Sequence, residues 1–480
     1  MNTAPSRFSA VYSENVAALR TRLAVGKNFD LIFKEIDAKG EKICFFAVDG
    51  LLKDGELQKI LTALLSSPPP PTAAAAARSV PCPECARTAD ADEAVRAVLS
   101  GQTLMLSSTF GPEALILDLR TYPGRETAEP ESDKVMQGAR DGFVETLVTN
   151  TALIRRRVRD ERLRMRCFNL GGSSAPDVVV CYMEGVADPA FVARVERKLC
   201  AVRPESLTLG FRSLAETLIR RRWYNPFPKI RTTERPDAAA AQVLEGNILI
   251  LCDASPQVML LPTSIFCYLQ QTDDYYYPPL TGSYLRVIRT ASLLLSLLMT
   301  PLWYLYLQNA DVLPAALRFL IPSAPGALPI LLQLYLAEAA VDGLKIASMN
   351  TPDMLSNSLS VVGALILGDF AVDVGWFCED VILYTAFIAI ANFAQQSHEL
   401  GYAFKFLRVM ILTFVALAGV YGLAFGLLLS VLLVAGNETV AGPHSYLYPL
   451  IPWNGRAMLR LLFRTKKRDF SDGAGRGESR

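Results

Sequence analysis

Long apolar segments dominate the last third of the chain, whereas the part before residue 285 alternates short apolar runs with polar ones. Five later segments are apolar enough for membrane helices: 287–308, 327–346, 353–371, 376–396 and 404–436. A spanning helix needs about 20 apolar residues because the hydrocarbon core is roughly 30 Å thick. The pattern therefore predicts a multidomain membrane protein, in which a soluble region precedes an all-α transmembrane domain.

Short runs in the soluble region have the periods of strands and amphipathic helices. The apolar runs 30–36 and 42–48 flank a turn that contains Gly40, which predicts a β-hairpin. Helical and strand-like runs then alternate twice, so we expect a two-lobed α/β region. The predicted divisions are a first α/β lobe (1–125), a charged linker (126–140), a second α/β lobe (141–284), the transmembrane domain (285–455) and a basic cytoplasmic tail (456–480).

A proline- and alanine-rich segment, 66–92, interrupts the first lobe. Its four consecutive prolines favour an extended stretch, so we interpret it as an insertion or a mobile loop. It contains a CxxC pair, Cys82 and Cys85. Three interpretations are open: half of a zinc site, a redox pair, or two reduced thiols in an exposed loop. The absence of a second CxxC or a histidine pair favours the last.

Composition narrows the classes of function. The formal net charge is +1, which gives no case for a nucleic-acid binder. Nine cysteines, an odd number, fit a reducing compartment, and the polar N-terminus has no signal-peptide pattern, so we expect the N-terminal region in the cytoplasm. The two histidines have no partner at metal-ligand spacing, and no catalytic constellation is visible. We therefore expect no metal, no cofactor and no enzymatic activity.

Acidic residues occur inside the apolar segments, where charge is costly unless it faces a bundle interior or a water path. Glu338, Asp342 and Lys345 share one helical face, with Lys345 placed to neutralise Asp342 in part. The two acids would form a cation-attracting ring if several subunits surrounded an axis; alternatively, their face lies in water at the membrane interface. A second group of acids, expected at a loop mouth and able to attract ions, comprises Asp369, Asp373, Glu379 and Asp380.

Small and weakly polar residues mark the segment 352–371 as a candidate pore helix. They occupy two neighbouring faces, with Ser356, Ser360 and Gly363 on one, and Asn357, Val361, Ala364 and Gly368 on the other. Such faces suit a narrow pore gated by an apolar constriction, and equally suit close packing of helices in lipid. Both interpretations are open.

Basic residues predict the topology. Arg286 and Arg289 precede the first apolar segment and a basic tail follows the last, so both ends should be cytoplasmic. An even number of crossings then leaves one of the five segments that does not cross. Either 327–346 lies in the interface, or 404–436 folds back near its glycines. We favour the first, which gives four spans.

Several stretches carry a resemblance to a known family: 122–160, 231–256, 270–289, 351–375 and 448–455. With them the chain resembles the A subunits of bacterial spore germinant receptors, the GerA family. The resemblance implies a multi-pass protein of the spore inner membrane that acts in germination. It also implies a homo-oligomer that conducts ions and works beside a transporter-like membrane partner.

These observations together lead to one expected function and two rivals. We expect a subunit of an oligomeric ion channel that releases monovalent cations across the lipid bilayer during germination. One rival is a non-conducting scaffold or signalling subunit of a germinant-receptor complex. The other is a nutrient receptor subunit, for which the sequence identifies no pocket residues.

Overall fold

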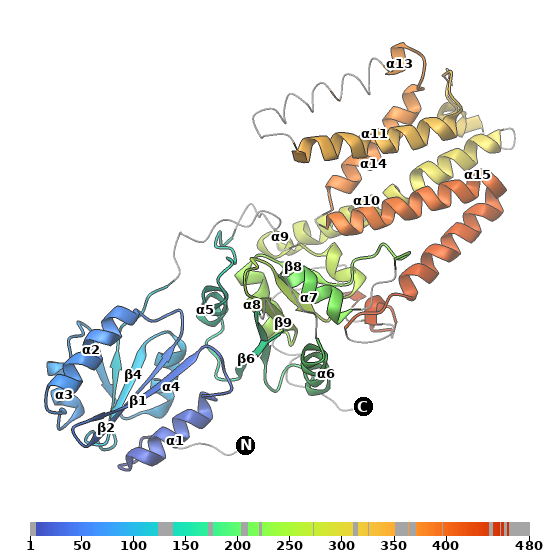
Figure 1. Cartoon of the computed structure of the whole chain (residues 1–480). Coiled ribbons are helices and arrows are strands. Elements are labelled where there is room, and N and C mark those ends of the chain that lie inside the picture. The colour runs from blue at the N-terminus through green and yellow to red at the C-terminus, as the bar shows by residue number, and fades with distance from the viewer. Residues whose placement is uncertain are drawn as a thin grey trace. The chain divides into compact units, whose positions relative to one another are not determined.

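The chain forms two compact units. In a computed structural model the first unit comprises Met1–Arg220, Ile230–Thr263 and Thr439–Ala441, and the second comprises Arg221–Lys229, Ser264–Glu438 and Gly442–Arg480. The first unit is α/β and the second is mainly helical (Figure 1). The structure describes residues 6–122, 138–170, 176–202, 210–219, 223–271, 273–310, 315–324, 326–350, 363, 371–395, 397–440, 445–451, 453–455 and 458–459.

Five antiparallel strands form the first sheet, in the order β1-β2-β4-β5-β3. Their bounds are β1 (Leu31–Ala38), β2 (Glu41–Val48), β3 (Cys85–Thr88), β4 (Thr103–Ser107) and β5 (Ala114–Leu117). Strands β1 and β2 form the expected hairpin, and its turn residues Lys39 and Gly40 both have positive φ. Positive φ at both positions gives a turn whose twist matches that of the flanking strands.

Helices cover both faces of this sheet, which explains the continuous apolar run of β2. Helices α1 (Tyr12–Arg22) and α4 (Ala91–Leu99) share one core with Phe46. Helices α2 (Asp54–Ser66) and α3 (Ala73–Ser79) share the other core with Phe45. Successive side chains of a strand point to opposite faces, so neighbouring phenylalanines are buried in different cores.

The segment 66–92 is part of the first lobe and not an inserted loop, which corrects the expectation from its composition. Its alanines form α3, where Ala73 and Ala76 are fully buried. The side chain of Thr72 caps that helix by accepting a hydrogen bond from the Ala75 backbone N–H. Strand β3 then pairs with β5 at the edge of the sheet. The prolines end α2, and the small alanine side chains let α3 lie close to the core.

The second sheet has strands β6 (Leu163–Asn169), β7 (Asp177–Met183), β8 (Arg231–Thr233), β9 (Ile248–Cys252) and β10 (Val258–Leu261), in the order β6-β7-β9-β10-β8. All its pairings are antiparallel. On one face lie α6 (Pro189–Cys200) and α7 (Phe211–Leu218), and on the other α5 (Leu147–Arg157) and α8 (Pro236–Leu244). The two-lobed α/β region is therefore confirmed.

The two lobes repeat one topology. In each, the strands lie in the order first, second, fourth, fifth, third, and helices enter the chain at the same points between them. A pair of hydrogen bonds from an asparagine side chain to the backbone of one residue repeats as well. Asn15 accepts from Ser9 N at 2.8 Å and donates to Ser9 O at 2.7 Å, and Asn150 makes the same two bonds with Val144 at 2.8 and 2.5 Å. The α/β region is thus built from two copies of one arrangement.

The lobes are joined by a buried ion pair. Arg155 Nε lies 2.6 Å from Asp30 Oδ2, and both side chains are 0% exposed. Arg155 Nη2 also donates to Asp30 Oδ1 at 3.1 Å. A guanidinium that donates to both oxygens of one carboxylate fixes the relative orientation of the two side chains as well as their distance.

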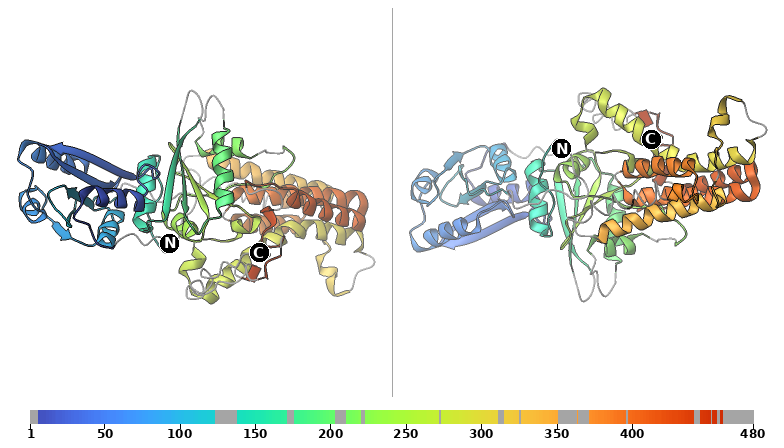
Figure 2. Two further views of the ribbon diagram at one scale, coloured as in Figure 1. Left: turned by 90° about the horizontal axis from the view of Figure 1, so that it is seen from below. Right: turned by 90° about the horizontal axis from the view of Figure 1, so that it is seen from above.

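The helical unit contains four of the five predicted apolar segments as helices. They are α10 (Pro279–Gln308), α11 (Ile330–Asn350), α14 (Glu379–Phe393) and α15 (His398–Ala435). Short elements complete it: η1 (Ile265–Leu269), α9 (Asp273–Tyr276), η3 (Ala315–Leu320), α13 (Ala371–Asp373) and η5 (Ser445–Leu447). Helix α10 packs against both α14 and α15 (Figure 2). The fifth segment, 353–371, lies outside the described residues apart from its positions 363 and 371.

Helix α15 reverses direction at Gly419, whose φ of 57° and ψ of −129° are not helical. The stretches before and after it pack on each other: a Cβ added at Gly422 would lie 1.8 Å from the Phe414 carbonyl oxygen, and the rings of Phe414 and Phe425 are 4.9 Å apart. Close approach of two backbones in this way requires glycine. The chain thus folds back within 404–436, near its glycines, whereas the number of membrane crossings stays a prediction.

Candidate functional site

Four charged side chains meet between α11 and α15. Glu338 and Asp342 are one turn apart on α11, and Lys405 and Arg408 are about one turn apart on α15. Lys405 Nζ lies 3.2 Å from Glu338 Oε2 and 2.5 Å from Asp342 Oδ2. Arg408 Nη2 lies 2.6 Å from Glu338 Oε1. Two acids and two bases compensate one another, so this charge cluster has no net charge when all four are ionised.

The charge cluster also reaches a third helix. Arg408 Nε donates to Glu338 Oε1 at 2.8 Å, while its Nη1 donates to the carbonyl oxygen of Ser296 on α10 at 2.7 Å. Lys405 Nζ donates in addition to the carbonyl oxygen of Glu338 at 2.9 Å. One arginine thereby connects α10, α11 and α15.

Apolar side chains enclose the charge cluster. Arg408 is 1% exposed and Glu338 is 9% exposed. Leu334 and Leu412 are buried one turn away, on α11 and α15 respectively. In such surroundings a lone charge costs several kcal/mol, whereas a paired and hydrogen-bonded one is tolerated. The pairing is therefore what permits these charges inside an apolar bundle.

Lys345 was expected to neutralise Asp342 in part, but its contact in the structure is a different one. Asp342 is paired with Lys405, and Lys345 lies over the ring of Tyr402, with Nζ 4.7 Å from the ring centroid. The sequence showed only neighbours on the same helix. A side chain from another helix reaches the carboxylate because the long side chain of Lys405 extends from α15 to α11.

The interface interpretation of 327–346 required its acidic face to lie in water. Instead, Glu338 faces α15 and is nearly enclosed. Asp342 is more open, with a side chain 34% exposed. The acids of α11 are thus internal contacts of the bundle, and free cation attraction by Glu338 is offset by Arg408.

The pore candidates fall mostly on residues for which no structure is described. Those outside the described part are Ser356, Asn357, Ser360, Val361, Ala364, Gly368 and Asp369. Asp373 is described and exposed at the end of α13. Glu379 and Asp380 lie in the first turn of α14, where acids suit the positive end of the helix dipole.

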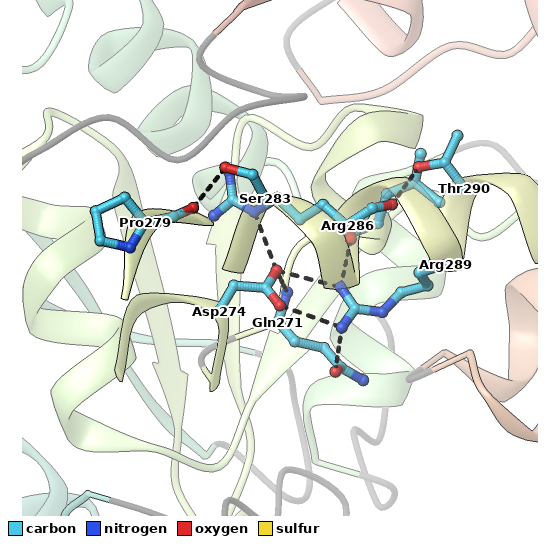
Figure 3. A network of polar contacts seen from close by, with 8 residues as sticks. Gln271, Asp274, Pro279, Ser283, Arg286, Arg289 and Thr290 are labelled. Atoms are coloured by element: carbon cyan, nitrogen blue, oxygen red, sulfur yellow. Dashed lines mark hydrogen bonds and ion pairs between the residues drawn. The ribbon is translucent and has the colours of Figure 1, made fainter. Parts of the chain in front are cut away.

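A second polar network lies where α10 begins (Figure 3). Arg286 Nε lies 3.0 Å from Asp274 Oδ2, and Arg289 bonds both oxygens of the same carboxylate at 3.2 Å. Arg289 also donates to Gln271 and to the Leu269 carbonyl. The two arginines used as topology signals are therefore buried structural partners of Asp274, which makes them weaker evidence for membrane orientation.

Sequence reasoning missed Lys405, Arg408 and Asp274. Lys405 and Arg408 stand three residues apart at the edge of the longest apolar run, with the correct spacing to share a helix face. That spacing was a usable signal, because paired bases in an apolar helix need acids on a neighbour. Within the described ranges, no three His, Cys, Asp or Glu side chains gather as a metal set.

Comparison with known proteins gives a consistent result along most of the chain. The family model described as Bacillus/Clostridium GerA spore germination protein matches residues 18–472. Stage V sporulation protein AF of Bacillus subtilis (strain 168) is 35% identical over 460 residues, which are 95% of this chain and 92% of that protein.

Two further relatives from the same organism are more distant. The uncharacterized membrane protein YfkQ is 26% identical, covering 86% of this chain and 82% of its own length. Spore germination protein A1 is 25% identical, covering 87% of this chain and 86% of its own length. The resemblance seen in the sequence is thereby confirmed: the chain belongs to the GerA family of spore germination proteins.

Proposed function

We propose that the chain is a subunit of a homo-oligomeric assembly in the spore inner membrane that conducts monovalent cations during germination. The observation that carries this is the buried charge cluster of Glu338, Asp342, Lys405 and Arg408 within otherwise apolar helices. Ionisable groups inside membrane helices are costly and usually serve an ion path or its gate. Family membership supports a role in germination.

A membrane location is supported by the helices themselves. Among the described residues, α10 and α15 are long and apolar enough to cross a membrane, judged by length and composition. Large apolar side chains are exposed on the last two long helices: Leu383, Phe387, Ile390 and Phe393 on α14, and Leu417, Tyr421, Phe425 and Leu428 on α15. Lipid or further copies of the chain would cover such faces.

The reversal at Gly419 supports a revised topology. If α15 folds back, its two ends lie on one side of the membrane. The crossings are then α10, α11, the segment 353–371 and α14, with α15 as a hairpin. This keeps four full crossings and both chain ends in the cytoplasm, and it lets α11 cross within the bundle. The α/β region is then cytoplasmic.

The conducting path in this proposal lies along 352–371 when several copies surround an axis. The charge cluster holds α11 against α15, and Asp373 at the exposed end of α13 contributes negative charge at the mouth. A transporter-like membrane subunit is the proposed partner. The two roles can be tested separately, because the structural contact uses the paired Glu338 and the charge at the mouth uses the exposed Asp373.

The test is cation flux from proteoliposomes that contain the purified chain, with and without the partner. Asp373→Asn should alter the selectivity between monovalent cations and anions while the oligomer stays intact. Glu338→Gln should weaken assembly, as measured by size-exclusion chromatography. Absence of flux with the partner present would refute conduction.

A non-conducting scaffold is the second candidate, and the neutrality of the charge cluster favours it. A compensated cluster stabilises a bundle without attracting ions. The scaffold predicts that Asp373→Asn has no effect on ion release in spores, whereas Glu338→Gln abolishes it through loss of the complex.

A further inference from the structure

The CxxC pair of the first lobe has no part in the proposed function. Cys82 follows α3, and Cys85 is the first residue of the edge strand β3, where it pairs with Leu117 of β5. Both cysteines are partly buried against the core beneath α2 and α3. Pro81 and Pro83 flank Cys82, which restricts the backbone of this turn.

The two side chains are directed at the same short turn. Cys82 Sγ donates to the Glu84 carbonyl oxygen at 3.2 Å, and Cys85 Sγ donates to the Cys82 carbonyl oxygen at 3.6 Å. Burial, with the Cys82 thiol beside it, raises the pKa of Cys85 to about 12. Cys85 is therefore a protonated thiol that points back toward Cys82.

The surroundings argue for a dithiol and against a metal ligand set. Structural zinc needs four ligands, and the described part of the chain brings no third His, Cys, Asp or Glu to this pair. Two adjacent thiols can form a disulfide with each other.

We propose that Cys82 and Cys85 form a reversible redox pair that closes to an intramolecular disulfide by exchange with a low-molecular-weight disulfide. The Cys82 thiolate attacks one sulfur of that disulfide, forms a mixed disulfide and releases one thiol. The sulfur of Cys85 then attacks Cys82 Sγ, and its proton goes to the leaving thiolate. Two protein thiols are oxidised and one external disulfide is reduced to two thiols.

Closure would constrain the turn between α3 and the edge strand β3. The five-residue connection 80–84 links a helix whose Ala73 and Ala76 are fully buried to a strand held on one side only. Constraining this link restricts local opening, which is the step that exposes a chain to protease. Arg78 and Arg87 are exposed on either side of the pair, so tryptic cleavage there reports the constraint.

The experiment uses the purified full chain in detergent, equilibrated with mixtures of oxidised and reduced glutathione. One portion is then denatured, alkylated and analysed by peptide mass spectrometry, and another is treated with trypsin while folded. We expect the wild type to lose two of its nine alkylatable cysteines together, as a Cys82–Cys85 disulfide, and to be cleaved more slowly at Arg78 and Arg87. Cys85→Ser should stop at a glutathione adduct on Cys82, and Cys82→Ser should accumulate less adduct.

Matched controls are Cys167→Ser and Cys200→Ser, which remove exposed cysteines elsewhere in the α/β region. Both should retain the paired loss. Circular dichroism checks that each variant is folded. A wild-type chain that stays fully alkylatable, or that gains glutathione at Cys82 without closing the disulfide, would overturn the proposal.

Discussion

The α/β region and the helical unit each contain a buried ion pair between an arginine and a carboxylate, but the two pairs have different structural roles. Asp30 and Arg155 are both 0% exposed and join two lobes that each have a five-stranded sheet, while Ala152 of the second lobe also packs in a core of the first. Glu338 and Arg408 join helices whose other shared contacts are largely apolar.

The difference lies in what else specifies the geometry. In a sheet, backbone hydrogen bonds between strands fix the register, so the pair acts only on the orientation of the lobes, together with contacts such as the 2.7 Å hydrogen bond from Phe29 N to Met165 O. Helices satisfy their own backbone, and in lipid their apolar faces do not select a partner by the hydrophobic effect. A polar contact such as Arg408 with Ser296 and Glu338 can then decide which turns of three helices meet.

The largest effect is expected at the joint between the lobes. Asp30→Ala leaves Arg155 buried without its carboxylate, which should lower the free energy of unfolding by about 3–5 kcal/mol. Pulse proteolysis in urea measures this, because all four tryptophans lie in the helical unit and fluorescence would not report it. The double variant Asp30→Leu/Arg155→Met should recover most of the loss. A single variant within about 0.5 kcal/mol of wild type would show that the pair is dispensable.

A somewhat smaller effect is expected for the charge cluster. Arg408→Leu should destabilise the helical unit by about 3 kcal/mol, because it leaves the nearly enclosed carboxylate of Glu338 with Lys405 as its remaining charged partner. Tryptophan fluorescence during thermal unfolding in detergent follows this unit selectively. Arg408→Leu/Glu338→Leu is the matched control and should be closer to wild type. If it is worse than the single change, then the pair contributes net stability and not only specificity.

The smallest effect is expected at the reversal of α15. Gly422→Ala places a methyl group against the Phe414 backbone and should cost about 1–3 kcal/mol or separate the two stretches. Gly401→Ala is the control, because the space around a Cβ there is open. The melting temperatures of the two variants in detergent give the comparison. Equal values would mean that the two stretches separate without loss.

Much of the architecture could be predicted from local pattern. The hairpin at Gly40, the two α/β lobes and four of the apolar helices follow from periodicity and turn residues. The segment 66–92 could not be predicted, because four prolines and an alanine run have the composition of a loop. Its order comes from a core that accepts Ala73 and Ala76 and from an open sheet edge beside β5.

The charge cluster, too, could be predicted only in part from the sequence. Glu338 and Asp342 could be identified from the sequence, because charge inside an apolar segment is energetically unfavourable. Their partners Lys405 and Arg408 could not, because they lie 67 and 70 residues away from Glu338. Spacing along one helix suggested Lys345 as the partner of Asp342, whereas in the fold Asp342 pairs with Lys405 of another helix. No local pattern carries that information.

The order of the regions, the family and the presence of charge among apolar helices can be read from the chain alone, because composition and period are local properties. Three features emerge only in the fold: the lobes repeat one topology, α15 turns back at Gly419, and the acids Glu338 and Asp342 are compensated. Those outcomes depend on contacts between residues far apart in the chain. Their energies arise only when packing removes water from both partners.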